Sequence, residues 1–435
     1  MTPSARISGA IDLLCAIQNA PFRPADATAN TFFRERRYIG GGDRRAISAL
    51  VWDVLRGWRR LHWHLRSRED ERHSDISPRL LCAAQLVFSG QNLEDVKGLF
   101  TGERYAPDCL TERESLMLDE LRGKTLSDGR QSRAVRFEVP DWLMPYLEKD
   151  FGDHVEEELE ALLGLPTLDL RVNLLKTTRE EAKRLLRKEG FEASETEYSS
   201  WGLRLRGRHP VTATKVFQDG LIEIQDEGSQ LIAAAVEAKA GQRVLDYCAG
   251  AGGKTLALAM TMENKGQVVA CDVSSPRLEG SVKRFRRAGV HNVTRHLLEE
   301  GDKWAKRREA SFDTVLVDAP CSGTGTWRRN PDARLRFSEK DLQELTVKQA
   351  QILHIAGKLV RPGGRLVYAT CSLLSAENDR QRDRFLTGND LFERAKPEEM
   401  SCWLPDVLKY RASFSLTPKE NGTDGFYVSV FKRKS

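Results

Sequence analysis

The sequence has no long hydrophobic run. Among its 435 residues, no stretch reaches the ~18 consecutive apolar residues of a membrane-spanning helix. Near the N-terminus, Asp12 interrupts the apolar segment 11–17, so the apolar core of a secretory signal is also missing. We therefore expect a cytoplasmic protein with no membrane-bound part.

Closely spaced cysteines are missing as well. The eight cysteines never lie within four residues of one another, which excludes the CxxC pairs of zinc sites and thioredoxin-like motifs. They stand at positions 15, 82, 109, 248, 271, 321, 371 and 402. We expect reduced thiols and no metal ion. The sequence also has no internal repeat and no low-complexity tract.

The composition is that of a globular protein with several domains. Hydrophobic residues make up 40% of the chain and aromatic residues 8%, which is enough for packed cores. At roughly 150 residues per domain, the length favours about three domains. The net charge is +5, and such a small excess points to a polyanionic partner only where the positive charges cluster.

Positive charge does cluster between Arg34 and Arg68. This stretch holds ten arginines against three acidic residues, a local excess of seven positive charges. It can be a solvated helix face or a face that binds RNA phosphates, which arginine pairs with bidentately. We favour the second interpretation. The residues singled out for RNA contact are Arg56, Arg59 and Arg60.

The first part of the chain, from 7 to about 125, has helical periodicity. Within 46–65 the apolar residues follow the i, i+3, i+4, i+7 pattern of one helix, and Asp43 can cap its start. A boundary is expected in 125–141, which is rich in turn-forming residues. A small α/β unit follows, with strands expected at 168–174 and 201–205 and a helix at 179–190.

From about residue 240 strands and helices alternate. Strands are expected at Arg243–Tyr247, Gln267–Asp272, Asp313–Asp318 and Arg365–Thr370. This spacing predicts a parallel, doubly wound α/β sheet. Ligands of such sheets bind beyond the carboxyl ends of the strands. The polar residues expected at that edge are Asp246, Asp272, Asp318 and Thr370.

A glycine-rich turn, CAGAGGKT (248–255), follows the first of these strands. A phosphate-binding Walker A loop would need glycine where Cys248 stands, and a dinucleotide loop would need a third glycine at Thr255. Neither objection applies to S-adenosylmethionine. The glycines leave room for its methionine moiety, and Asp272 at the end of the next strand can accept hydrogen bonds from its ribose hydroxyls. We therefore favour S-adenosylmethionine over ATP and NAD.

Two cysteines are expected at the same sheet edge. Asp318 and Cys321 follow one strand, and Cys371 follows another. Methylation at C5 of cytosine needs a thiolate that adds to C6 and makes C5 nucleophilic, a carboxyl group at N3, and a base that removes the C5 proton. An amino-nitrogen methyltransferase needs no thiol. These residue types therefore favour methylation at carbon, although periodicity does not say which cysteine is the nucleophile.

Five motifs in order resemble the RNA cytosine-C5 methyltransferase family. They are QDEGSQL (225–231), CAGAGGKT (248–255), DAPCSGTG (318–325), YATCS (368–372) and TDGFYVSVF (423–431). The helical start resembles the NusB-like domain of the bacterial Sun/Fmu type, which acts on 16S rRNA. The resemblance implies an all-α NusB-like RNA-binding domain at 1–135, a small α/β RNA-recognition subdomain at 136–235, and a class I S-adenosylmethionine-dependent catalytic domain at 236–435.

The resemblance also implies roles for single residues. Cys371 would be the nucleophile, Cys321 would assist release, Asp318 would contact base and cofactor, and Lys254 would position the loop. Glu299 or Asp302 would approach the adenine, since the family's aspartate is not at the expected position. The implied cofactor-binding residues are Cys248, Ala249, Gly250, Ala251, Gly252, Gly253, Lys254, Asp272, Arg277, Glu299 and Asp318.

Some interpretations stay open. Residues 225–229 can close over the cofactor or serve as a plain helix cap, and 327–330 (WRRN) are favoured as a substrate contact. The same chemistry on tRNA, or a non-catalytic RNA-binding assembly factor, are the alternatives to an rRNA methyltransferase. We expect a monomer that binds RNA and needs no metal.

Overall fold

The computed structural model describes residues 1–66, 76–207 and 209–435. The chain forms two compact units, each of which takes two separate segments of sequence. Unit 1 comprises 1–164 and 327–339, and unit 2 comprises 165–326 and 340–435. The expected boundary segment 125–141 lies within unit 1. The three-domain division at residues 135 and 235 stays a prediction.

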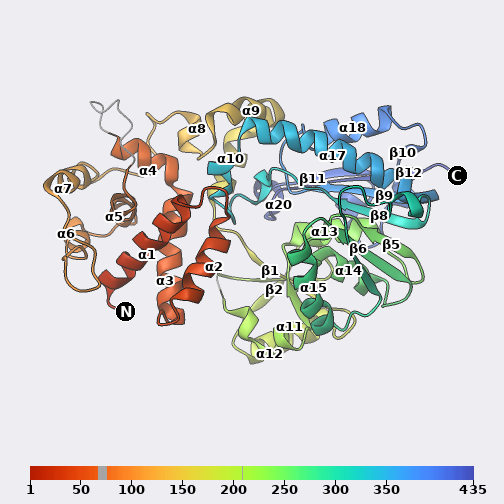
Figure 1. The fold of residues 1–435 in the computed structure, drawn as a ribbon, viewed down its shortest axis with the longest axis horizontal. Coiled ribbons are helices and arrows are strands. Elements are labelled where there is room, and N and C mark those ends of the chain that lie inside the picture. The colour runs from red at the N-terminus through yellow and green to blue at the C-terminus, as the bar shows by residue number, and fades with distance from the viewer. Residues whose placement is uncertain (67–75, 208) are drawn as a thin grey trace. The chain divides into compact units, whose positions relative to one another are not determined.

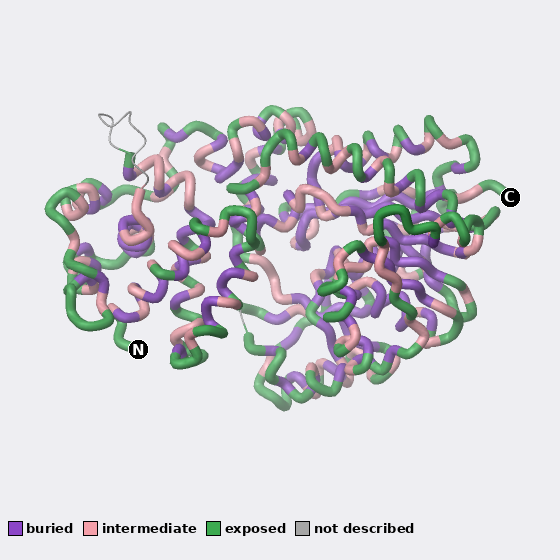
Figure 2. The backbone as a smooth tube through the Cα atoms, in the orientation of Figure 1, coloured by how far each residue is buried: buried purple, intermediate pink, exposed green. Residues whose placement is uncertain are grey.

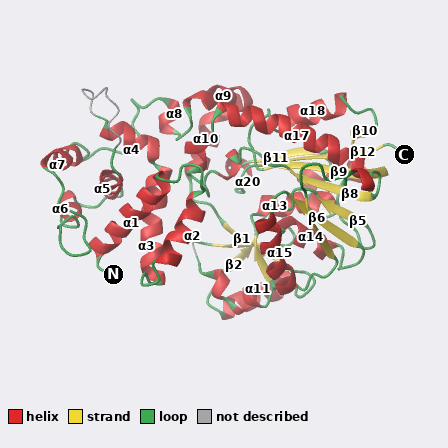
Figure 3. Cartoon of the chain, viewed as in Figure 1, coloured by secondary structure: helices red, strands yellow, loops and turns green. Residues whose placement is uncertain are grey.

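Unit 1 is helical, as its periodicity predicts, and every described strand belongs to unit 2 (Figures 1 and 3). Its core holds Leu13, Leu14, Ile47 and Leu81, all fully buried. The helices of unit 1 are α1 (Pro3–Gln18), α2 (Ala25–Glu35), α3 (Gly41–Arg56), α4 (Trp58–Leu65), α5 (Pro78–Phe88), α6 (Leu93–Lys97), α7 (Glu112–Asp119), α8 (Arg133–Arg136), α9 (Met144–Phe151), α10 (Val155–Leu163) and α16 (Ala333–Arg336).

The single helix expected over 46–65 is wrong, because α3 ends at Arg56 and α4 begins at Trp58. Gly57 between them lacks helical geometry, and glycine ends helices readily. The expected cap is also wrong: no side chain caps α3, whose N-cap is Gly40. Asp43 lies in the first helical turn and accepts a hydrogen bond from Arg6 at 2.8 Å.

Unit 2 contains a small antiparallel sheet and a large, mostly parallel one. The small sheet has the order β2-β3-β1-β4, and its strands β1 and β3 and the helix α11 confirm the expected α/β unit to within a few residues. Its elements are β1 (Leu168–Val172), α11 (Arg179–Lys188), β2 (Ala193–Glu195), β3 (Gly202–Leu205), α12 (Lys215–Gln218) and β4 (Ile222–Ile224).

The large sheet has the order β10-β12-β9-β8-β5-β6-β7, with β11 paired to β12. Strands β5 to β9 run parallel to one another, which confirms the predicted doubly wound sheet, and all four expected strands are present. The strands are β5 (Arg243–Asp246), β6 (Gln267–Asp272), β7 (Val293–Leu297), β8 (Phe312–Asp318), β9 (Val360–Thr370), β10 (Phe392–Arg394), β11 (Ser413–Leu416) and β12 (Phe426–Arg433).

Alternate residues of each central strand enter two different cores. Val244 of β5 packs in one core with α13 and α14, whereas Leu245 packs in the other with α17 and α18. Both faces of the sheet are therefore covered, and the central strands appear as buried tube in Figure 2. The helices around the sheet are α13 (Glu227–Val236), α14 (Gly253–Thr261), α15 (Ser275–Ala288), α17 (Glu339–Leu359), α18 (Asp379–Thr387), α19 (Asp406–Lys409) and α20 (Pro418–Asn421).

The end of the chain completes the large sheet. The terminal motif runs into β12, which pairs antiparallel with β9 and brings residues 423–425 beside the loop after β8. The Gly425 N–H donates to the Gly325 carbonyl at 2.8 Å, and the Gly325 N–H donates to the Cys371 carbonyl at 3.0 Å. A Cβ on Gly325 would lie 2.2 Å from the Gly425 carbonyl oxygen, so this contact requires glycine. No described helix is long and apolar enough to cross a membrane.

Candidate active site

The cofactor loop joins β5 to α14 and has the geometry of a ligand cradle. Gly252 has a positive φ of 78°, and α14 begins directly after it. The Asp272 carboxylate accepts the Gly250 N–H at 2.7 Å and so fixes the loop against the end of β6. A Cβ added at Gly250 would meet nothing within 4 Å, which means that open space lies beside the loop.

Lys254 and Asp318 form an ion pair at the edge of the sheet. The Lys254 ammonium donates to the Asp318 carboxylate at 2.7 Å. Burial lowers the pKa of Lys254, but the charge and the hydrogen bond of Asp318, together with other acidic groups nearby, outweigh it, so that pKa is raised. The pair brings together two of the four residues expected to be catalytic.

Asp246 is fully buried at the end of β5. One carboxylate oxygen accepts the Thr255 hydroxyl at 2.7 Å, and the other has no hydrogen-bond partner in the described chain. Burial raises the pKa of Asp246 to about 7, and the charge of Asp318 adds to this shift. The site therefore contains a carboxyl group that titrates near neutral pH.

The two expected catalytic sulfurs lie next to each other. The Sγ atoms of Cys321 and Cys371 are 3.4 Å apart, although the residues belong to loops after different strands. The hydrogen bond with Cys371, together with burial, raises the pKa of the Cys321 thiol well above its usual value. Cys321 therefore holds its proton more tightly than an ordinary thiol.

Sequence reasoning missed Glu377, which holds these two loops together. Its buried carboxylate accepts the Ser322 N–H at 2.9 Å and the Ser322 hydroxyl at 2.5 Å, and also the hydroxyl of Ser372. Gln349 of α17 donates to the same carboxylate at 2.9 Å. Ser322 and Ser372 directly follow the two cysteines, so Glu377 fixes the backbone beside both sulfurs. The only sequence signal is an acidic residue six positions after Cys371.

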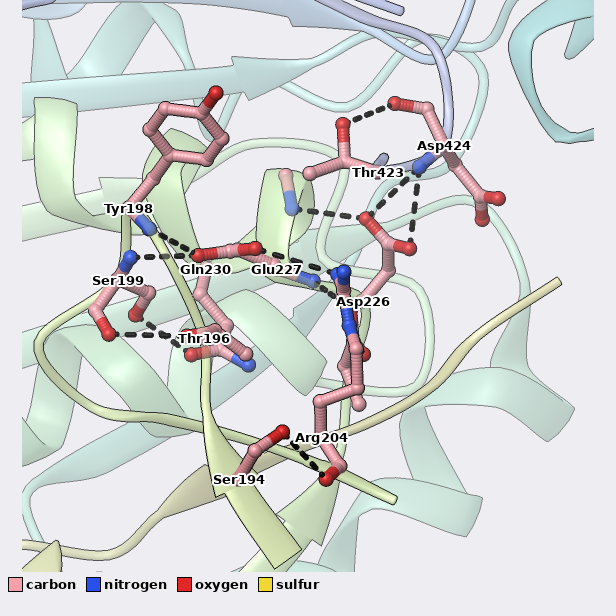
Figure 4. A network of polar contacts seen from close by, with 12 residues as sticks. Ser194, Thr196, Tyr198, Ser199, Arg204, Asp226, Glu227, Gln230, Thr423 and Asp424 are labelled. Atoms are coloured by element: carbon pink, nitrogen blue, oxygen red, sulfur yellow. Dashed lines mark hydrogen bonds and ion pairs between the residues drawn. The ribbon is translucent and has the colours of Figure 1, made fainter. Parts of the chain in front are cut away.

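The small sheet reaches the cofactor loop through Arg171. Its guanidinium donates to the Gly253 carbonyl at 2.8 Å and to the side chain of Gln225. Asp226 caps α13 by accepting the Gly228 N–H at 2.8 Å and also accepts the Asp424 N–H (Figure 4). Of the two interpretations for 225–229, the structure thus supports the helix cap.

The neighbouring Glu227 ties α13 to the small sheet. It is fully buried and accepts the N–H groups of Tyr198 and Ser199, at 2.5 and 2.8 Å (Figure 4). It also pairs with Arg204, whose guanidinium binds Asp169 at 2.7 Å. The motif QDEGSQL therefore connects α13, which packs on the large sheet, to the small sheet of unit 2.

The remaining expected cofactor residues lie beyond β6 and β7. Both Asp302 carboxylate oxygens are occupied, by His296 at 2.6 Å and by the Trp304 N–H at 2.7 Å. Glu299 follows Leu297, the register partner of Asp272 in β7, and its side chain is exposed. Arg277 is exposed on the first turn of α15. Sequence reasoning missed Val273, which directly follows Asp272 and is 70% exposed.

The three arginines singled out for RNA contact are engaged within unit 1. Arg60 pairs at 3.0 Å with the fully buried Glu138, whose carboxylate also accepts the Arg59 N–H at 2.8 Å. Arg59 pairs with Asp141, and Arg56 is itself buried and donates to the Arg328 carbonyl. A phosphate-binding face built on these three side chains is therefore wrong. Arg68, at the end of the same stretch, lies outside the described residues.

Only part of the segment 327–330 is open to a substrate. Trp327 and Arg328 are only 2% and 5% exposed, whereas Asn330 is exposed, and the segment belongs to unit 1. An indole so deeply buried has no free face for a base. In the described parts of the chain, no group of three or more His, Cys, Asp or Glu side chains could hold a metal ion.

Comparisons with known proteins agree with this arrangement. Residues 233–432 match the family described as 16S rRNA methyltransferase RsmB/F, and residues 139–212 match the ferredoxin-like domain of the same proteins. A relative from Synechocystis sp., named probable ribosomal RNA small subunit methyltransferase B, is 30% identical, with 90% of this chain and 91% of the relative covered.

Two solved structures share the fold. The structure named PH0851 covers 100% of this chain and 99% of its own, with a TM-score of 0.79 and 22% identity. NSun6 from Pyrococcus horikoshii with SFG covers 68% of this chain and 98% of its own, with a TM-score of 0.60 and 20% identity. The fold is that of a class I S-adenosylmethionine-dependent methyltransferase, and the chain belongs to the RsmB/F family of 16S rRNA methyltransferases.

Proposed function

We propose that the protein transfers a methyl group from S-adenosylmethionine to C5 of a cytosine in 16S rRNA. The observation that carries this proposal is the pair of sulfurs 3.4 Å apart, next to the ion pair of Lys254 and Asp318 in the same unit. Methylation of oxygen or of an amino nitrogen gives no role to two adjacent thiols, whereas methylation at C5 uses both.

The residues beside the loop fit S-adenosylmethionine. Open space at Gly250 admits the methionine moiety, Asp272 is placed to accept ribose hydroxyls, and the exposed Val273 offers an apolar face to the adenine. Glu299 is the better candidate for the adenine amine, because the Asp302 carboxylate is already occupied. When bound, S-adenosylmethionine supplies an electrophilic methyl group on a sulfonium.

Cys371 is the nucleophile in this mechanism. Its thiolate forms a bond to C6, and the electrons of the C5–C6 double bond move to C5. C5 can then take the methyl group as the bond between that group and sulfur breaks and its electron pair stays with the sulfur. Cys321 keeps its proton and can donate a hydrogen bond to the Cys371 sulfur, which stabilises the thiolate. Asp318 contacts N3 of the base, and the Lys254 ammonium holds Asp318 in place.

Cys321 acts in the second half of the reaction. After methylation, the C5 proton must leave to a base and the bond between C6 and the Cys371 sulfur must break, which restores the aromatic ring. Cys321 lies within reach of that bond and assists this elimination. The order of steps separates the two thiols: one is needed before the covalent adduct and the other after it.

A denaturing gel with cytosine-containing rRNA tests the proposal. Cys321→Ala should form the adduct and release it slowly, so a band of protein joined to RNA accumulates. Cys371→Ala should give neither band nor product, and the double variant should resemble it. A band with Cys371→Ala instead would reverse the two roles. Unchanged turnover in both variants would contradict cysteine-mediated methylation.

Cofactor and substrate are tested separately. Calorimetry should detect binding of S-adenosylmethionine and none of ATP, and the opposite result would contradict the cofactor assignment. Bisulfite sequencing of RNA from cells with and without the gene should show one protected cytosine in 16S rRNA. Protection in tRNA would keep the chemistry and change the substrate, whereas no lost site would favour a non-catalytic assembly factor. An rRNA substrate implies a cytoplasmic enzyme.

A further inference from the structure

Unit 1 contains a large groove, and of the three arginines singled out for RNA contact only Arg59 is among its described lining residues. Its volume is about 1510 Å³, above the ~300–1,000 Å³ of a typical small-molecule pocket. All its described lining residues belong to unit 1, from the segments 58–66, 113–124, 130–142 and 334–337. A groove of this size suits an elongated ligand better than a metabolite.

Aromatic rings line the groove and are only partly buried. Three of the chain's eight tryptophans are found here: Trp58, Trp63 and Trp142. Phe337 lies with its ring centroid 5.4 Å from that of Trp142. Flat rings that are accessible from a groove can stack on nucleobases, and such stacking does not depend on sequence.

The charge of the groove is strongly positive. Six of its described lining residues are lysine or arginine, and two are acidic. Arg66 and Lys124 are exposed and make no ion pair with the described residues, whereas Arg130 pairs with Asp128 and also lies over the Trp63 ring at 5.5 Å. The guanidinium of Arg334 is buried and has one nitrogen, Nη2, with no hydrogen-bond partner there.

We propose that this groove binds an unpaired segment of the RNA substrate, with bases stacked on its tryptophans and phosphates bound by Arg66 and Lys124. Bases in a duplex are already stacked on each other, so the aromatic lining favours a single strand over a helix. The proposal rests on RNA being the substrate, and it gives unit 1 an RNA-binding role that does not depend on Arg56 or Arg60, whereas Arg59 lines the groove while paired with Asp141.

Binding of a labelled oligouridylate of about 12 nucleotides to the full chain tests the proposal. The double variant Arg66→Glu/Lys124→Glu should weaken binding at least about tenfold and make it less dependent on salt. The matched control, Arg104→Glu/Lys149→Glu, makes the same charge change at exposed positions of unit 1 outside the groove and should weaken binding less than about twofold. Equal losses in the two double variants would overturn the proposal.

Trp63→Leu tests the stacking independently of charge. It should weaken binding of the single strand roughly tenfold and leave binding of a duplex unchanged. Equal displacement of the oligouridylate by polyglutamate from wild type and Trp63→Leu would show that charge alone holds the ligand, and would overturn the proposal. If Cys321→Ala gives no covalent band of protein and RNA but still binds the oligouridylate, the result would contradict the proposed function without contradicting RNA binding by the groove.

Discussion

Asp246 illustrates how one buried side chain makes stability depend on pH. Burial raises its pKa from 3.8 to about 7. Between these values the unfolded chain has lost the proton while the folded chain keeps it, so the contribution of Asp246 to the free energy of unfolding falls as pH rises. Above pH 7 the folded protein holds a buried carboxylate, and the cost is then complete.

Asp246→Asn removes this titration and keeps an oxygen for the Thr255 hydroxyl. We expect the variant to be more stable than wild type by about 2–4 kcal/mol at pH 8, because about three pKa units correspond to roughly 4 kcal/mol at most. At pH 4.5 the two proteins should differ by less than about 1 kcal/mol. Thermal unfolding at both pH values measures the difference. An equal difference at the two values would show that Asp246 does not titrate in this range.

At the same scale, the sequence predicts which chemical groups are present better than it predicts their surroundings. Asp318, Cys321 and Cys371 follow strands, and strand ends meet at one edge, so their proximity could be predicted. The environment of Asp246 could not, because its burial depends on helices and strands from distant parts of the chain. The contacts of Glu377 could not be predicted for the same reason.

At the scale of elements, Glu377 joins the loops that follow β8 and β9. Glu377→Gln places an amide where the carboxylate accepts hydrogen bonds from Ser322, Ser372 and Gln349. The amide nitrogen then faces the hydroxyls of Ser322 and Ser372, which must give up their hydrogen bonds to the carboxylate and turn to accept one, and this costs about 1 kcal/mol and loosens the two loops. Release of the RNA needs the two sulfurs to be correctly placed relative to each other. We therefore expect the variant to accumulate the covalent RNA adduct, which a denaturing gel detects.

The matched control for this prediction is Glu393→Gln, the same chemical change at an exposed position of β10. It should release RNA as wild type does. If Glu377→Gln instead loses stability without any adduct, Glu377 supports the fold and does not set the position of the thiols. If both variants behave as wild type, the hydrogen bonds of Glu377 do not matter for release.

Helix α4 begins beside a second buried carboxylate, Glu138. It has a positive φ of 57°, an unfavourable value for a residue with a side chain, and is held there by hydrogen bonds with the start of α4. Glu138→Ala leaves Arg60 without its buried partner, so we expect a loss of about 3 kcal/mol in urea unfolding. Glu148→Ala, which breaks an exposed pair with Arg133, should cost less than about 1 kcal/mol. Similar losses in the two variants would contradict a structural role for Glu138.

The same helix shows where sequence patterns fail for elements. Periodicity correctly indicates helices in 46–65, since the apolar face must be buried whichever way the chain bends. It does not reveal that Arg59 and Arg60 meet Glu138, nearly 80 residues later in the sequence. Parallel strands β5, β6 and β8 have apolar centres that end in an aspartate, and they could be predicted. The short antiparallel strands β10 and β11 at the edge carry no comparable signal.

At the scale of the whole molecule, the chain leaves unit 1 after residue 164 and returns to it at 327–339. The returning segment is part of the helical unit's structure. Asp332 accepts the Ala25 N–H at 3.0 Å, at the start of α2, where Pro24 offers no side-chain cap. A residue more than 300 positions away therefore caps this helix, and the folding of unit 1 depends on sequence that follows the loop of Cys321.

Asp332→Ala should therefore destabilise α2. We expect a loss of about 1–2 kcal/mol, as for other helix caps, because the buried Ala25 N–H is left without an acceptor. Hydrogen exchange of the α2 amides in the full chain measures it, and these amides should exchange roughly tenfold faster than in wild type. The control Asn330→Ala changes an exposed residue of the same segment and should leave exchange unchanged. Faster exchange confined to 327–339, with α2 unaffected, would mean that the returning segment only lies on unit 1 and does not stabilise it.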